Sequence, residues 1–168
     1  MGWLNDGTVR AVFPISSTVG TDSYNAGGSY TIDAATGIQV RGMGLGSTVW
    51  GPSSTTTFSG VGSITLTDPL VTVEAVTAVF NVPLLSMVGL TLDKSFNFGG
   101  TLRLNIANPD LQGVTAIANG TLVYNTTGAL GPETTGTSNS IEIGNGTLQF
   151  NSAVGGNFSY SLAEPIKF

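Results

Sequence analysis

Side chains that perform catalysis are scarce in this sequence of 168 residues. Histidine and cysteine are both absent, which removes thiol nucleophiles, triads with a histidine base and nearly every tight transition-metal site. Ten acidic residues remain, and a pair of carboxylates can hydrolyse a glycosidic bond. Most stand at predicted turns, where Asp is expected for backbone reasons, and no local pattern selects a pair. We therefore predict no catalytic residue, no metal site, no cofactor and no enzymatic activity, and assign no cofactor-binding residues.

Four Asn-x-Ser/Thr sequons lie in the last third of the chain, and these are acceptors for N-glycosylation in a secreted protein: Asn119, Asn125, Asn145 and Asn157. Asn119 and Asn145 are each followed by glycine at a predicted turn, so they are the best acceptors if the host glycosylates. The same Asn-Gly pairs also suit ordinary turns, which is the more economical interpretation.

Aromatic side chains are a second class of candidate ligand-binding groups. They could line a sugar or cofactor pocket, but aromatic residues that alternate along strands more often form core or cross-strand pairs, and we favour that interpretation. The residues in question are Trp3, Trp50, Tyr24, Tyr30, Tyr124 and Tyr160.

Charge is sparse, and it limits the classes of partner. Only 9% of the residues are charged, the net charge is −5, and the five cations are scattered along the sequence. Such a chain cannot assemble a stripe of phosphate contacts, so we expect no nucleic-acid partner and no attraction to anionic lipid headgroups. The low charge and the abundance of Thr, Ser and Asn favour an extracellular, cell-surface or virion-exterior location.

The sequence predicts that short strands position these side chains. β-branched or aromatic runs, several of them alternating, are separated by Gly, Asn, Asp and Pro, and they cover residues 8–15, 62–68, 70–80, 101–107, 121–125, 141–150 and 157–163. We expect residues 51–60 and 128–140 to be long surface loops. The sequence thus predicts one all-β domain over residues 1–168, an antiparallel β-sandwich or a jelly-roll-like barrel.

The uncharged stretch 75–92 is just long enough to be weighed as a membrane-spanning helix. Asn81, Pro83, Gly89 and several β-branched residues instead favour two buried strands around a turn that contains proline. We expect no direct membrane insertion.

A spacing of glycine and proline recurs along the chain. Gly60, Gly100 and Gly156 each lie nine residues before a proline, with strand-like residues between, and Gly28 begins an imperfect copy in which Gly37 replaces the proline. The copies start at unequal intervals, which argues against a solenoid of fixed period. The spacing predicts a strand followed by a corner, used three or four times.

Residues 28–71 resemble the middle of the HtaA-type surface domains of haem-uptake systems. The resemblance rests on "GSYTIDAATGIQVRGMGLGSTVW" followed by "GSITLTDPLV", in which a strand containing Tyr, an Asp-x-Ala-Thr-Gly turn and an Asp-Pro corner succeed one another. It implies a β-rich fold that holds haem through Tyr with a supporting His. This chain has no His, so Tyr30 is the one residue that carries over.

These observations favour a non-enzymatic, self-associating subunit of an extracellular fibre, surface layer or virion shell, with copies of itself as partners. Uncharged segments such as residues 42–67 leave little repulsion between copies, and residues 1–15 could form an extended arm or donor strand. The alternative is a cell-surface module that binds haem or a carbohydrate.

Overall fold

Strand β10 (Val76–Phe80) shows how the chain builds its core, because its residues alternate strictly between buried and half-buried positions. Val76, Ala78 and Phe80 point inward, while Thr77 and Val79 point outward. A computed structural model describes residues 7, 11–13, 18–19, 22–23, 28–32, 37–46, 54–74, 76–94, 99–126, 128–131, 140–150 and 166–167.

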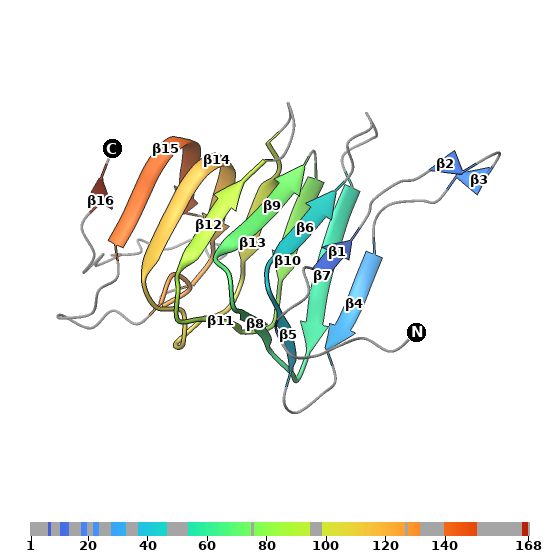
Figure 1. The fold of residues 1–168 in the computed structure, drawn as a ribbon, viewed down its shortest axis with the longest axis horizontal. Helices are drawn as coiled ribbons and strands as arrows, with labels where there is room; N and C mark the ends of the chain where they lie inside the picture. Colours follow the sequence, from blue (N-terminus) through green and yellow to red (C-terminus); the bar gives the residue numbers. More distant parts are fainter. Residues whose placement is uncertain are drawn as a thin grey trace.

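The strands stack in parallel into a β-solenoid (Figure 1). The first face contains β4 (Gly28–Ile32), β7 (Ser54–Gly60), β10 and β13 (Thr101–Leu104). The second face contains β5 (Ile38–Val40), β8 (Ile64–Leu66) and β11 (Leu84–Ser86). The third face contains β1 (Ala11–Phe13), β6 (Met43–Gly46), β9 (Leu70–Glu74) and β12 (Leu90–Asp93). The coils β4–β6, β7–β9 and β10–β12 visit the three faces in this order.

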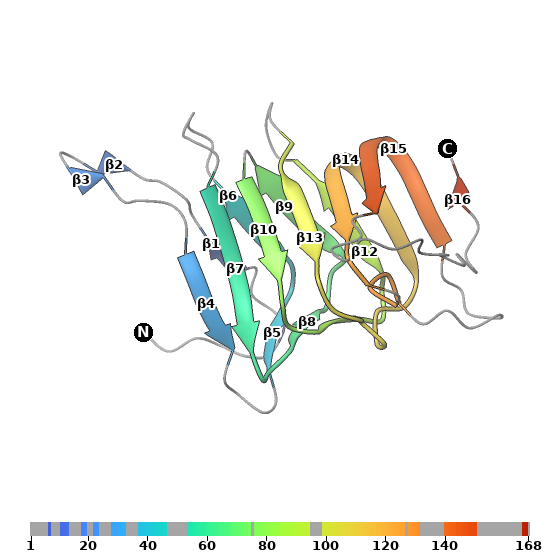
Figure 2. The same ribbon diagram turned by 180° about the vertical axis from the view of Figure 1, so that it is seen from behind.

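Two longer strands pass from the third face to the first without a break. In β14 (Val114–Tyr124), the first half pairs with β12 and the second half pairs with β13. Strand β15 (Ser140–Phe150) pairs with β14 along both halves, and both strands visibly bend in Figure 2. Gly120 lies at the bend of β14 with φ +86°, a conformation that favours glycine.

Two short pieces complete the described strands. Strand β16 (Ile166–Lys167) pairs with β15 at Ile141 and Glu142. Strands β2 (Thr18–Val19) and β3 (Asp22–Ser23) form an antiparallel hairpin. All the other pairings between described strands are parallel.

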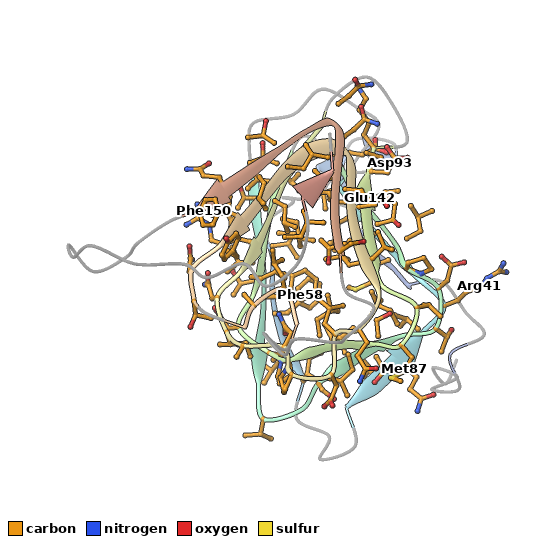
Figure 3. All side chains as sticks on the ribbon, turned by 90° about the vertical axis from the view of Figure 1, so that its left-hand side faces the viewer. Arg41, Phe58, Met87, Asp93, Glu142 and Phe150 are labelled. Atoms are coloured by element: carbon orange, nitrogen blue, oxygen red, sulfur yellow. The ribbon has the colours of Figure 1, made fainter. Side chains whose placement is uncertain are left out.

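The core is a stack of apolar side chains inside the coils, seen end-on in Figure 3, where Phe58 lies within the ribbon while Arg41 and Met87 lie at its outside. Phe58 and Phe80 occupy the same position in successive coils, and their rings stack with centroids 4.8 Å apart. Leu104 and Tyr124 hold the next two positions, and both are buried. Stacking of like side chains therefore buries one continuous core.

The predicted antiparallel sandwich or jelly-roll-like barrel is wrong, although the prediction of an all-β fold is confirmed. Strands of three to five residues separated by short corners look alike in the sequence whether their partners run parallel or antiparallel. Hydrophobic alternation fixes which face of a strand is buried, and it says nothing about the direction of the neighbouring strand.

The predicted segments differ from the structure in two places. Residues 54–60 of the expected loop form strand β7, in which Thr56 and Phe58 point into the core while Thr57 between them points outward. The stretch 75–92 contributes parts of three strands, not two, with Pro83 at the corner before β11. Among the described residues, no helix has the length and hydropathy to cross a bilayer.

The recurring glycine–proline spacing does not mark equivalent positions. Gly60 ends β7, whereas Gly100 lies directly before β13, so the two copies begin at opposite ends of the first face. Gly156 lies outside the described residues. The true repeat is the coil, and the equivalent residues Thr55, Thr77, Thr101, Thr121 and Thr147 are 22, 24, 20 and 26 residues apart. Unequal coil lengths are therefore compatible with a solenoid.

Candidate functional site

The outward surface of the first face is built from rows of equivalent residues, one residue from each coil. The threonine row consists of Thr55, Thr77, Thr101, Thr121 and Thr147. All five are exposed or half-buried, because the residue that follows each of them points into the core. Parallel strands are about 4.8 Å apart, so the hydroxyl groups repeat at that interval along the solenoid.

A second row lies at the opposite edge of the same face, where the chain turns toward the second face. The asparagine row consists of Asn81, Asn105 and Asn125. The Asn105 side-chain amide donates to Asn81 Oδ1 at 2.7 Å, and the Asn125 amide in turn donates to Asn105 Oδ1. The amide groups thus link three coils in one direction, and each is oriented by its neighbour.

Arg103 lies between these rows, in the middle of the first face. Its strand neighbours in register are Val79 and Val123, and Leu102 and Leu104 on either side of it are buried. The guanidinium Nε is buried and has no hydrogen-bond partner within the described structure. Arg103 was one of five cations in the sequence, and nothing in the sequence distinguished it from the others.

The acidic residues in the described ranges have different surroundings. Asp68 Oδ2 lies 3.9 Å from Arg41 Nε, and Asp68 Oδ1 accepts a hydrogen bond from the Leu70 amide. Asp93 Oδ1 accepts a hydrogen bond from Asn119 Nδ2 at 2.7 Å. Glu74 is buried at the end of β9. Within these ranges, no group of three or more Asp or Glu side chains could hold a metal ion.

One hollow lies at the corner between the second and third faces. Its volume is about 270 Å³, and it is lined by Arg41, Gly42, Asp68 and Leu70. That volume lies below the range of about 300–1,000 Å³ that is common for small-molecule sites. Arg41 and Asp68 are also open to solvent there, with 68% and 40% of their side chains exposed.

The sequons occupy three different environments. Asn119 is half-buried and bonded to Asp93, and Asn125 belongs to the asparagine row, so both side chains already have structural partners. Asn145 is exposed at the bend of β15, between Gly144 and Gly146. Asn157 lies outside the described residues. Of the three described sequons, Asn145 is therefore the most accessible to a modifying enzyme.

Of the six aromatic residues that the sequence suggested for a pocket or the core, Tyr124 has a described side chain. Tyr124 is 2% exposed and packs against Phe150 with ring centroids 4.5 Å apart, as expected for a core pair. Tyr30 lies in β4 in register with Phe58. Trp3, Trp50, Tyr24 and Tyr160 lie outside the described residues.

The C-terminal coil exposes part of the core. The inward positions of β14, Ile117, Leu122 and Tyr124, are at most 2% exposed. Their equivalents in β15 are less covered: Ile143 and Leu148 are half-buried, and Phe150 is 44% exposed. Beyond Glu142, none of the described strands pairs with the outer edge of β15.

Part of the predicted N-terminal arm, residues 1–15, lies within the described structure. Strand β1, at residues 11–13, pairs in parallel with β6 of the same chain.

Comparisons with protein-family models, with curated proteins and with solved structures find no match to this chain.

Proposed function

We propose that this chain is a non-enzymatic structural subunit that self-associates end to end, in an extracellular fibre, surface layer or virion shell. The observation that carries the proposal is the partly exposed core of the last coil, at Ile143, Leu148 and Phe150. Terminal coils of a solenoid need a cover for their apolar interior. A second copy of the chain supplies such a cover.

The backbone register indicates which strands meet. Among the described strands of the first face, β4 is the last on the N-terminal side and the second half of β15 is the last on the C-terminal side. Tyr30 of β4 and Phe150 of β15 belong to the same row, which runs through Phe58, Phe80, Leu104 and Tyr124. Placing β4 of one copy beside β15 of another, in parallel, continues this row and the backbone hydrogen bonds.

Such a contact joins two different surfaces, so it does not close on itself. Head-to-tail contacts generate open filaments unless the rotation between copies closes a ring. Low charge supports close approach, because Glu142 is the one charged residue in β15. Fibres are therefore the expected form, and layers or shells require additional lateral contacts.

Light scattering and negative-stain electron microscopy of the purified chain test this proposal. We expect filaments or a mass that increases with concentration, and Phe150→Lys should reduce both because it places a charge at the joint. Val61→Lys is the matched control, since Val61 is 84% exposed at the corner between β7 and β8. Circular dichroism checks that both variants fold.

Two results would overturn the proposal. One is a stable monomer at high concentration. The other is a folded Phe150→Lys variant that assembles as well as the Val61→Lys variant. If Phe150→Lys fails to fold, Thr147→Lys replaces it, because Thr147 is exposed on the same strand.

A further inference from the structure

The third face carries one more described strand than the first face. The described strands of the first face run from β4 to the second half of β15, whereas those of the third face run from β1 to β16. Because β1 pairs with β6, it lies one coil before the coil β4–β6. Strand β16 belongs to the same coil as the second half of β15. These two short strands lie at opposite ends of the solenoid in Figure 1.

This difference determines where β1 falls in the head-to-tail joint proposed above, on which this inference rests. When β4 of a second copy lies beside β15 of the first, the coil that precedes β4 coincides with the coil that contains β16 of the first copy. On the third face, one strand position then lies between the first half of β15 of the first copy and β6 of the second. Parallel strands are about 4.8 Å apart, so this shared position holds the width of one strand. Both β16 of the first copy and β1 of the second copy fall in the shared position.

The register shows that the two short strands occupy different stretches of the shared position. Strand β16 pairs with Ile141 and Glu142 of β15. Strand β1 begins at Ala11, which is in register with Met43 of β6. The row of Met43 continues through the coils to β15, and its members are Met43, Val71, Leu92, Ile117 and Ile143. Ala11 of the second copy therefore lies beside Ile143 of the first, directly after the stretch that β16 covers.

The stretch of β15 that starts at Ile143 is open to such a strand. Ile143 is half-buried, whereas the other members of its row, from Met43 to Ile117, have no exposed surface. Gly144 and Asn145 are exposed, and none of the described strands pairs with this part of the edge. A strand added here supplies backbone partners to the edge and covers Ile143 as its equivalents in the other coils are covered.

We propose that β1 is a donor strand. It pairs with β6 of its own chain and, through its other edge, pairs in parallel with β15 of the preceding copy, so that Ala11 lies beside Ile143 and Val12 lies beside Gly144. Strands β16 and β1, from two chains, then together complete one strand of the third face. Strand addition of this kind gives affinity through main-chain hydrogen bonds. The partner is a second copy of this chain, since its β1 arrives in the register that the open stretch of β15 requires.

Cysteine cross-linking of the full chain tests this contact, because the sequence contains no cysteine. Neighbouring residues in register have Cα atoms about 4.8 Å apart, which a disulfide can bridge. The third-face pair is Val12→Cys mixed with Gly144→Cys, oxidised with oxidised glutathione and separated on a non-reducing gel. A Cβ at Gly144 meets its nearest neighbours at 3.6 Å, an ordinary contact. We expect a disulfide-linked dimer, several-fold more abundant than that from the control pair, Val12→Cys mixed with Val61→Cys.

The control pair uses a residue away from the joint, since Val61 is 84% exposed at the corner between β7 and β8. The first-face pair, Ser29→Cys mixed with Gln149→Cys, reports the contact of β4 with β15 independently. Ser29 and Gln149 are the two ends of one row of the first face, whose intervening members are Thr57, Val79, Arg103 and Val123.

The two pairs distinguish failure of the strand donation from failure of the joint. If the first-face pair cross-links but the third-face pair does not exceed the control pair, strand donation is overturned while the end-to-end joint stands. If neither pair cross-links, the joint is overturned and strand donation with it. Circular dichroism checks that each variant folds. If Val12→Cys does not fold, Ala11→Cys mixed with Ile143→Cys replaces the third-face pair, because these are the preceding neighbours in register.

Discussion

Asn105 Nδ2 donates a hydrogen bond to Asn81 Oδ1 across 2.7 Å, which joins two successive coils through their side chains. Because Asn105 also accepts from Asn125, it is the middle member of the row. Asn105→Ala removes both bonds and should lower the free energy of unfolding by about 1–2 kcal/mol. Urea denaturation measures this change. Asn145→Ala, at an exposed position, should stay within about 0.5 kcal/mol of wild type, and an equal loss in both variants would contradict the role of the row.

Asn108 connects two corners of the solenoid and is 1% exposed. Its Oδ1 accepts from the Leu84 amide at 2.8 Å, and its Nδ2 donates to the Ala129 carbonyl at 2.6 Å. Asn108→Ala leaves both backbone groups without a partner and should destabilise the fold by about 2–4 kcal/mol. Thermal and urea denaturation check this value. Asn108→Asp keeps the acceptor for Leu84 but loses the donor, so stability equal to wild type would refute the contact with Ala129.

Gly89 and Gly144 are a matched pair for testing the corners. Gly89 has φ +94°, and a Cβ there would collide with the Val114 carbonyl oxygen. A Cβ on Gly144 would meet its nearest neighbours at 3.6 Å, an ordinary contact. Gly89→Ala should therefore cost about 1–3 kcal/mol of stability, while Gly144→Ala should change it by less than about 1 kcal/mol. Similar melting temperatures for the two variants would count against the strained corner.

Phe80 tests the core, because its ring stacks on Phe58 and it is 1% exposed. Phe80→Ala opens a cavity and should lower the free energy of unfolding by about 3–5 kcal/mol. Phe80→Leu should cost less than about 1.5 kcal/mol, because Leu104 occupies the same row in the next coil. Both values come from chemical denaturation. The stacking model fails if leucine and alanine are equally harmful.

Some strands of this fold could be predicted from the sequence, but β7, which was expected to be a loop, and the pairing partners of the strands could not. The alternation in 70–80 and the run in 141–150 correspond to β9, β10 and β15. Stacking between coils decides which strand lies beside which. In the sequence, this stacking is visible only as similar residue types at equivalent positions of successive coils. The glycine–proline spacing matches glycines at opposite ends of the first-face strands, so it does not identify the equivalent positions.

A better signal was present in the sequence. The pentapeptides "TAVFN", "TLRLN", "TLVYN" and "TLQFN", which begin at Thr77, Thr101, Thr121 and Thr147, share an outward threonine, an inward apolar or aromatic residue and a final asparagine. Their alignment identifies the coils directly. It also locates the threonine and asparagine rows before any coordinates are known.

The surroundings of Arg103 could not be predicted from the sequence, for a different reason. Arg103 becomes distinctive only because register places it between Val79 and Val123, on a face whose other described positions are neutral. No local pattern around Arg103 encodes those neighbours. Likewise, the shielding of its Nε depends on side chains from other coils.

In β14 and β15 the chain passes from one face to the next through a bend, and these strands pair with strands of neighbouring coils. The length of the solenoid can therefore change by whole coils. Removing residues 101–120 joins Gly100 to Thr121, so that Thr121 takes the place of Thr101 and the Gly-Thr junction is kept. Evolution can lengthen or shorten such a protein by duplication or loss of a coil, and each such step changes its reach by about 4.8 Å while its cross-section stays the same.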